Sequence, residues 1–521
     1  MKNEVKKRVK KMFVRVNSIG MFGMNSFGVG VEASIERGLP RFDLVGLPDA
    51  AVSESRDRVR SAMKNSEFYY PDCRVTVNLT PADIRKEGPV YDLPILVSLL
   101  VATGQMHCDL KYSAFIGELS LSGKIRKVTG ALPMVIKAKE LGMKEVFVPA
   151  LNAYEVSVVK GIDIYPVKSV RQLHDHFSGK EKIRKVTSSL YNEYTVDLNF
   201  VPDFADVKGQ FQVKRALEIA AAGGHNILMI GPPGSGKSML AKRLPSILPD
   251  MTFEESLDVT KIYSIAGKLP DNVSLIKSRP YRAPHHTIST AGLSGGGRIP
   301  RPGEISLSHH GVLFLDELPE FSKVSMEAMR QPLEDGKITI SRVSGSLTYP
   351  CEIMLVCAMN PCPCGFYGHP TKKCTCGKGV PQKYMSKVSG PLLDRLDIHV
   401  EVPQVEFSKL SSEEKGESSA EIKKRVNAAR RIQTERFKGT SVTCNAKMTP
   451  SQTSEFCRLS EAGKKILERC FETMDLSARA YDKILRIART IADLEGSADI
   501  EVPHITEAVQ YRSLDRKFWN A

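Results

Sequence analysis

The residues best suited to chemistry form a short glycine-rich run, GPPGSGKS, at 231–238. The run fits the spacing G-x-x-x-x-G-K-[ST], in which glycines free the backbone amides to wrap phosphates and the following helix adds the positive end of its dipole. Lys237 would contact the β- and γ-phosphates of a nucleotide, and Ser238 would ligate Mg²⁺. The expected cofactors are therefore ATP and Mg²⁺. The expected binding residues are Gly231, Pro232, Pro233, Gly234, Ser235, Gly236, Lys237 and Ser238.

A pair of carboxylates follows a second apolar run, GVLFLDE, at 311–317. A buried parallel strand here would deliver Asp316 and Glu317 to its carboxyl end, the edge of an open α/β sheet at which ligands bind. Asp316 would hold Mg²⁺ directly or through water, and Glu317 would polarise the attacking water. Asn360 closes another apolar run, CEIMLVCAMN, where it can help to orient that water. These residues predict a site that hydrolyses a nucleotide.

Two arginines complete the expected catalytic set. Arg395, in GPLLDRLD, would reach the γ-phosphate of a neighbouring subunit as an arginine finger. Arg479, in SARA at the start of an expected helix, would sense the γ-phosphate bound by its own subunit. A lone arginine more often forms a surface salt bridge, so both assignments depend on the position of these residues relative to the other motifs.

Four of the 11 cysteines stand in two close pairs, Cys362-Pro-Cys364 and Cys374-Thr-Cys376. Four thiolates brought together by a glycine- and proline-containing turn suit tetrahedral zinc. The C-x-C spacing is less typical of zinc sites than C-x-x-C, and four reduced, free thiols are the alternative. Zinc held by four protein ligands has no open position for catalysis, so the expected role is structural.

Two pairs of adjacent histidines, His285–His286 and His309–His310, invite a second metal hypothesis. Neighbouring residues on a strand point to opposite faces, so neither pair is expected to chelate a metal by itself. We expect structural or substrate-contacting roles for them.

The charge balance favours an anionic partner. The formal net charge is +15, and basic surfaces attract nucleic acid through counterion release. A surplus of lysine that only promotes solubility is the alternative. A helix expected near 419–437 carries a basic stripe, which is more often a solvated face than a DNA contact. This stripe consists of Lys423, Lys424, Arg430 and Arg431.

The surrounding pattern predicts an α/β protein of several domains. No run approaches the roughly 20 apolar residues of a membrane span, and no signal peptide is recognisable, so we expect a cytoplasmic protein without a membrane partner. The expected parts are a basic extension at 1–11, an α/β domain at 12–178, a linker at 179–199, a nucleotide-binding core with a parallel sheet at 200–410 and a helical domain at 411–521. Expected helices include Ala50–Lys64, Lys237–Ile247, Ser451–Glu472 and Ala478–Leu494.

Several longer stretches make the chain resemble the magnesium-chelatase-like AAA+ family known as YifB or ComM. They include FDLVGLPDAAVSESRDRVRSA, RPYRAPHHTIS, PGEISLSHHGVLFLDELPEF, AMNPCPCG and LSARAYDKILRIARTIADL. The resemblance spans nearly the whole chain and implies a hexameric ATPase with an AAA+ core and a helical lid. Within the family, ComM is a branch-migration helicase used in natural transformation, so DNA is the implied partner. The stretch from Arg282 to Arg301 resembles the insertion that lines the pore, where Arg298 and Arg301 could contact a phosphate backbone; a plain surface loop is the alternative.

The first domain is similar to the Lon protease domain, with GELSLSGKIRKVTGALP as the best match. Lon-type peptidases use a serine and a lysine. On this alignment Val90 occupies the position of the serine and Met134 that of the lysine. Without a nucleophile and a base, covalent peptidase chemistry has no route, so we expect a folded but proteolytically inert domain.

The leading hypothesis is thus an ATP-driven ring motor on DNA. A chaperone that passes peptide through its pore remains as an alternative, as does a motor that inserts a metal ion with a large partner subunit. A Lon-like protease is disfavoured by the missing serine and lysine.

Overall fold

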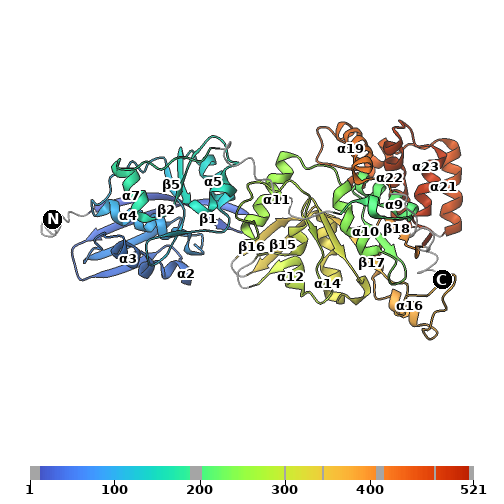
Figure 1. Ribbon diagram of the computed structural model, residues 1–521, viewed down its shortest axis with the longest axis horizontal. Helices are drawn as coiled ribbons and strands as arrows, with labels where there is room; N and C mark the ends of the chain where they lie inside the picture. The colour runs from blue at the N-terminus through green and yellow to red at the C-terminus, as the bar shows by residue number, and fades with distance from the viewer. Residues whose placement is uncertain are drawn as a thin grey trace. The chain divides into compact units, whose positions relative to one another are not determined.

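The computed structural model describes residues 12–187, 202–297, 301–342, 345–405, 416–474 and 477–514 (Figure 1). The chain divides into two compact units. Of the described residues, the first unit comprises 12–187, 256–276, 341–342 and 345–348, and the second comprises 202–255, 277–297, 301–340, 349–405, 416–474 and 477–514. The first unit therefore includes two segments that lie far along the chain from the rest of it.

The first unit is built on a seven-stranded mixed sheet with the order β3-β4-β2-β1-β5-β8-β9. Its strands are β1 (Met12–Phe22), β2 (Asn25–Glu36), β3 (Arg41–Val45), β4 (Arg74–Thr80), β5 (Ser113–Phe115), β8 (Glu145–Pro149) and β9 (Asp163–Val167). β1, β2 and β4 pair antiparallel, whereas β5, β8 and β9 run parallel. On β4 every second residue is buried, the alternation expected when one face of a strand packs on a core.

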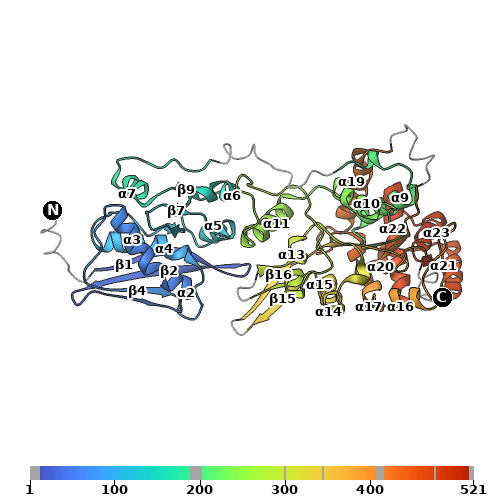
Figure 2. The same cartoon turned by 60° about the horizontal axis from the view of Figure 1, so that its bottom comes forward.

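The helices of the first unit are α2 (Ala50–Ser53), α3 (Ser55–Asn65), α4 (Asp92–Ala102), α5 (Ala131–Glu140), α6 (Ala153–Val156) and α7 (Val170–Ser178). Both α4 and α5 pack on β1 and β2 (Figure 2). α4 is apolar on almost every side and is buried along nearly its whole length. The helix predicted at Ala50–Lys64 is observed as two helices, α2 and α3, that meet at Glu54.

The second unit contains a five-stranded sheet with the order β11-β14-β17-β10-β18. Its strands are β11 (Tyr281–Arg282), β14 (Val312–Leu315), β17 (Met354–Met359), β10 (Ile227–Ile230) and β18 (Ile398–Glu401), and every pairing is parallel. All residues of β10, β14 and β17 are buried, as in a parallel sheet covered on both faces. Because the strands are parallel, their carboxyl ends meet at one edge, and the predicted site residues follow these ends.

The other elements are helices and short ribbons. The helices are α9 (Phe211–Gly223), α10 (Lys237–Arg243), α11 (Phe253–Ile265), α12 (Thr290–Ser294), α13 (Glu304–Leu307), α14 (Lys323–Ala328), α15 (Arg330–Asp335), α16 (Val380–Met385), α17 (Gly390–Leu393), α19 (Ser419–Arg436), α20 (Pro450–Phe456), α21 (Glu461–Met474), α22 (Ala478–Glu495) and α23 (Val502–Gln510). The ribbons pair β6 (Glu118–Leu119) with β7 (Ile125–Arg126), β12 (Gly295–Gly296) with β13 (Arg301–Pro302) and β15 (Lys337–Arg342) with β16 (Gly345–Pro350).

The C-terminal helices gather beside α9, and α22 packs against α9, α19 and α23 (Figure 1). Besides the helix predicted at Ala50–Lys64, two further predicted helices are wrong in their extent. Pro245 has no N–H to donate, so α10 ends at Arg243 and the chain continues as a 3-10 turn. The helix predicted at Ser451–Glu472 breaks into α20 and α21, because Leu459 between them pairs as a β-bridge with Ile500. The α/β fold with a parallel sheet and a helical C-terminal region is confirmed, and no helix in the described ranges is long and apolar enough to cross a membrane.

Candidate ATP-hydrolysis site

The phosphate loop connects β10 to α10, so it lies at the carboxyl edge of the parallel sheet. A Cβ atom on Gly231 would stand 2.2 Å from the carbonyl oxygen of Val402, which explains why this position has no side chain. Gly236, at φ +91°, precedes the first turn of α10 in a conformation that favours glycine. Gly234 is also left-handed, and a Cβ there would meet open space. The loop is therefore packed tightly at Gly231 and is open beside Gly234, where phosphates can approach the backbone amides.

The ammonium group of Lys237 lies inside this loop. Its Nζ donates to the carbonyl oxygen of Gly231 at 2.8 Å and to Oδ1 of Asn360 at 3.1 Å. Burial lowers the pKa of Lys237, while the nearby carboxylates of Asp316 and Glu317 oppose that shift. The structure thus brings together the lysine, the two acids and the asparagine that the motifs single out separately. The ammonium group contacts carbonyl oxygens that a bound phosphate would replace.

The carboxylates follow β14, next to the sheet's central strands. Oγ of Ser238 donates to Oδ2 of Asp316 at 2.5 Å, so two oxygen ligands of the kind that Mg²⁺ prefers stand side by side. Asp316 also accepts a hydrogen bond at 3.0 Å from the backbone N–H of Glu317. Glu317 has φ +53°, an uncommon conformation for a residue other than glycine, and its side chain is 56% exposed. These donor atoms fit ATP with Mg²⁺: Ser238 and Asp316 for the metal, and Glu317 for a water molecule.

His286 was not assigned to the site from the sequence. Its Nδ1 lies 3.5 Å from Oε2 of Glu317, which makes it a neighbour of the expected catalytic carboxylate. The available signal was its position just after β11, the strand that pairs in parallel with β14. His286 therefore joins the candidate site as a residue that can hold Glu317 in place.

The expectation that adjacent histidines point to opposite faces is wrong for both pairs. The ring centroids are 4.1 Å apart for His285 and His286, and 3.8 Å apart for His309 and His310. None of the four lies in a strand, and His310 has φ +54°, so the alternation of a strand does not apply. His309 is buried and accepts a hydrogen bond at Nδ1 from the backbone of Glu352 at 3.0 Å.

Gln210 is a second residue that the sequence analysis missed. It precedes α9, and its Nε2 donates to the carbonyl oxygens of Ser235 at 3.1 Å and Pro403 at 2.9 Å. The side chain thereby ties the phosphate loop to the segment after β18. No local motif marks this glutamine, because both of its partners are distant in the sequence.

The two predicted arginines lie near each other. Arg395 forms an ion pair with Glu334, and Arg479 lies 3.1 Å from Oδ2 of Asp394. Burial lowers the pKa of Arg395, and the charge of Arg479 contributes to the same shift. Within the described ranges, neither arginine forms a hydrogen bond or ion pair with the phosphate loop. Their printed partners are therefore Glu334 and Asp394, and their roles at a nucleotide site stay predictions.

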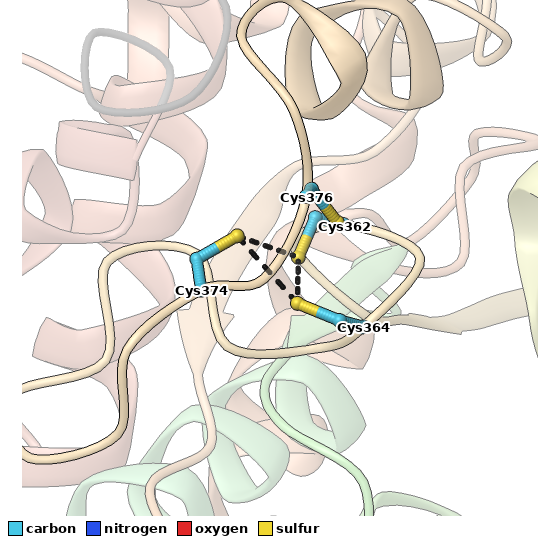
Figure 3. Close-up of side chains that lie close together, drawn as sticks. All are labelled: Cys362, Cys364, Cys374 and Cys376. Carbon is cyan, nitrogen blue, oxygen red and sulfur yellow. Dashed lines mark hydrogen bonds between the residues drawn. The ribbon is translucent and has the colours of Figure 1, made fainter.

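The four cysteines of the second predicted site converge (Figure 3). Sγ of Cys362 lies 3.3 Å from that of Cys364 and 3.8 Å from that of Cys374, and the Cys364–Cys374 distance is 3.5 Å. Cys376 belongs to the same group, in which all the sulfur atoms lie within 4.8 Å of one another. This arrangement brings four soft ligands to one point, as a tetrahedral zinc site requires.

Some of the basic residues predicted to contact DNA are exposed, and others pair within the protein. Arg301 is exposed in β13, whereas Arg298 lies outside the described residues. On α19, Lys423 pairs with Asp250 at 2.6 Å and Arg430 donates to backbone carbonyls, so part of the basic stripe is engaged within the protein.

In the first unit, the two positions aligned with the Lon-type serine and lysine are both buried apolar side chains. These are Val90 and Met134.

Comparison with known protein families agrees with this architecture. The family described as "Magnesium chelatase, subunit ChlI" matches residues 203–410, "Subunit ChlI of Mg-chelatase" matches 31–152, and "Magnesium chelatase, subunit ChlI C-terminal" matches 416–512. These three matches cover the AAA+ core, much of the first domain and the C-terminal helices.

Similar proteins extend over almost the full chain. "Competence protein ComM" of Haemophilus influenzae is 41% identical over 508 residues, which is 96% of this chain and 97% of the relative. YifB of Escherichia coli is 41% identical over 503 residues, with 96% and 97% covered. "Lon protease 2" of Bacillus subtilis is 27% identical over 168 residues, 30% of each chain. With the geometry of its phosphate loop and paired acids, the chain belongs to the magnesium-chelatase-like AAA+ ATPase family that includes ComM and YifB.

Proposed function

We propose that this protein is a ring-forming motor that hydrolyses ATP to move or remodel DNA, with branch migration as the expected activity. The observation that carries the ATPase part is the juxtaposition of Lys237, Ser238, Asp316 and Glu317 at one edge of the parallel sheet. The DNA part is supported by the net charge of +15 and by the similarity to a protein named for competence.

The residues divide the chemistry of hydrolysis among them. Bound Mg²⁺ would neutralise charge on the phosphates, and Ser238 and Asp316 are the residues that would hold it. Lys237 would turn from the loop carbonyls to the phosphate oxygens. Glu317 would accept a proton from the water that attacks the γ-phosphorus, as the bond from that phosphorus to the oxygen of the leaving ADP breaks. Asn360 lies within reach of Lys237 and would help to orient the water.

His286 adds a positioning role to this scheme. Glu317 is exposed and sits in a left-handed conformation, so its side chain needs a neighbour to fix its direction. The 3.5 Å contact with His286 supplies that neighbour. We propose that His286 holds the carboxylate until substrate is bound.

The arginines suggest that one subunit completes the site of the next. Arg395 and Arg479 lie close enough together for their charges to interact, and within the described residues neither makes a hydrogen bond or ion pair with the phosphate loop of its own chain. The role of Arg395 in a neighbouring subunit is proposed on this ground and on its sequence motif. The assignment of Arg479 to the nucleotide of its own subunit remains a prediction.

Zinc bound by the four cysteines would be structural.

The first experiment measures ATP hydrolysis with single-stranded, duplex and four-way-junction DNA. We expect DNA to stimulate hydrolysis and Glu317→Gln to lower the rate about 100-fold or more, because it removes the proton acceptor. The same variant should trap a DNA complex at low salt. Glu320→Gln makes the same change just outside the site and should retain most of the rate. If DNA leaves the rate unchanged and a protein substrate raises it, the DNA assignment is wrong.

A second experiment tests the shared site by mixing two inactive variants. Lys237→Ala disables the phosphate loop but retains Arg395, and Arg395→Ala does the reverse. Mixed rings should regain part of the activity, because the intact loop of one subunit can face the intact arginine of the next. A mixture that stays as inactive as its components would contradict the role of Arg395 in a neighbouring subunit.

A further inference from the structure

The cysteine loop, residues 362–376, packs directly on the phosphate loop. Gly365 has φ +81°, and a Cβ built on it would stand 2.2 Å from Cδ and 2.8 Å from Cγ of Pro233. The backbone of the cysteine loop therefore lies against the proline ring, with no space for even one additional carbon atom. Pro233 directly precedes Gly234, the residue beside which the phosphate loop is open.

The cysteine loop is also joined to the catalytic edge through the chain itself. β17 ends at Met359, Asn360 accepts a hydrogen bond from Lys237, and Cys362 follows two residues later. Cys362 is fully buried, and the N–H of Gly365 donates to its carbonyl oxygen at 2.9 Å. The turn that positions Gly365 against Pro233 thus contains the first two cysteines.

This turn has little regular structure to hold it. Residues 360–379 contain no helix or strand, and the convergence of the four sulfur atoms closes the loop. Without a metal these groups can remain protonated thiols joined only by weak S–H contacts, whereas a metal ion binds all four as thiolates. A metal ion would therefore fix the shape of the loop, and with it the position of Gly365.

We propose that zinc bound by Cys362, Cys364, Cys374 and Cys376 supports the phosphate loop through the Gly365–Pro233 contact, so that nucleotide affinity depends on metal occupancy. This inference rests on the proposed nucleotide site and adds a structural condition to it. Loss of the metal by chelation would release the cysteine loop from Pro233. The phosphate loop would then sample more conformations, and ATP would bind more weakly.

The metal is tested by elemental analysis and by titration with a fluorescent ATP analogue in the presence of excess Mg²⁺. We expect one zinc ion per chain. After removal of zinc with a chelator that does not take Mg²⁺, the Kd for the analogue should rise about tenfold, and added zinc should restore it. Cys374→Ser should reproduce the effect without a chelator. Cys470→Ser, in α21 outside the loop, is the matched control and should retain both zinc and affinity.

The contact is tested separately by Gly365→Ala. This variant keeps all four thiols but cannot maintain both its φ of +81° and its distance from Pro233. It should retain one zinc ion per chain and bind the analogue about tenfold more weakly. Gly377→Ala is the control in the neighbouring turn, because a Cβ there would meet only Val380 at 3.8 Å.

The outcomes separate this proposal from the proposed function. Unchanged affinity in zinc-free protein or in Gly365→Ala would overturn the coupling, while ATP hydrolysis by the wild-type protein would stand. A wild-type protein that hydrolyses ATP and holds no zinc would also overturn it. If the wild-type protein neither binds nor hydrolyses ATP, the proposed function itself fails.

Discussion

Replacing Lys483 with methionine should reveal how the C-terminal helices hold the segment that carries Arg395. Lys483 lies on α22, and its Nζ is 3.1 Å from Oδ1 of Asp397 and 3.0 Å from the carbonyl oxygen of Leu396. Both charged side chains are largely buried, with 13% and 14% exposed. Asp397 also lies 3.3 Å from Nδ1 of His225. Burial alone would raise the pKa of Asp397, but Lys483 and His225 hold that pKa below its usual range.

The size of the effect follows from this burial. Removing one partner of a buried ion pair costs about 3–5 kcal/mol, because the other charge remains away from water. His225 still contacts Asp397 in the variant, so we expect a loss of about 3 kcal/mol in the free energy of unfolding. Arg479→Met is the matched control. This variant breaks the ion pair between Arg479, on the same helix, and Asp394, whose N–O distance is also 3.1 Å. Because Arg479 is 65% exposed, the loss in the free energy of unfolding should stay below about 1 kcal/mol.

Calorimetry at pH 7 can follow the second unit, and the ATPase rate gives the functional consequence. We expect Lys483→Met to lower kcat, since the backbone around Arg395 loses one of its supports, and to leave the KM for ATP nearly unchanged. Adding Asp397→Asn to Lys483→Met should recover part of the stability, because the unpaired charge is removed. If Lys483→Met were no less stable than Arg479→Met, the pair would not hold this segment and the reasoning would be refuted.

Three further predictions concern buried or closely packed groups. Burial lowers the pKa of His309 to about 2, so below pH ~6.5 the unfolded chain binds a proton that the folded protein excludes. The free energy of unfolding should therefore fall by about 2 kcal/mol from His309 between pH 7 and pH 5, and His309→Gln should flatten this part of the measured pH dependence. His286→Ala should lower kcat several-fold, on the order of 1 kcal/mol, with little change in the Kd for ATP, because only the direction of Glu317 is affected; a change confined to the Kd would contradict this role. Gly231→Ala should abolish binding of an ATP analogue, because its Cβ would meet a carbonyl oxygen at 2.2 Å; retained binding would show that the loop can shift.

Motifs contained in one stretch of sequence were predictable. The phosphate loop is specified by eight consecutive residues between a buried strand and a helix, and both elements are present where the pattern places them. The four cysteines also converge as their spacing suggests. In both cases the residues that meet belong to one short loop, so their spacing along the chain is enough to predict that they lie close together.

Contacts between distant segments were not predictable in this way. Gln210 reaches Ser235 and Pro403 because α9 and β18 pack side by side, and nothing in its local sequence indicates this. His286 is close to Glu317 because β11 pairs with β14. The break between α20 and α21 depends on Ile500, a residue far along the chain. The helical periodicity of the local sequence does not reveal it, so a single helix was predicted.

Three segments that are distant in the sequence contact the phosphate loop. The carbonyl of Val402 closes one side at Gly231, Gln210 donates to the carbonyl of Ser235, and Gly365 presses on Pro233.

The acids, by contrast, follow directly from β14, which pairs with strands on both sides. A substitution in one of the segments that contact the phosphate loop, at Val402, Gln210 or Gly365, should therefore change mainly the Kd for ATP. The reason is that it moves the phosphate-binding amides. A disturbance confined to Glu317, after the end of β14, should change kcat instead, since this residue acts on water, whereas Asp316 would hold Mg²⁺. Variants of residues that contact the phosphate loop should therefore change mainly the Kd for ATP. Variants of residues that contact Glu317 should change mainly kcat.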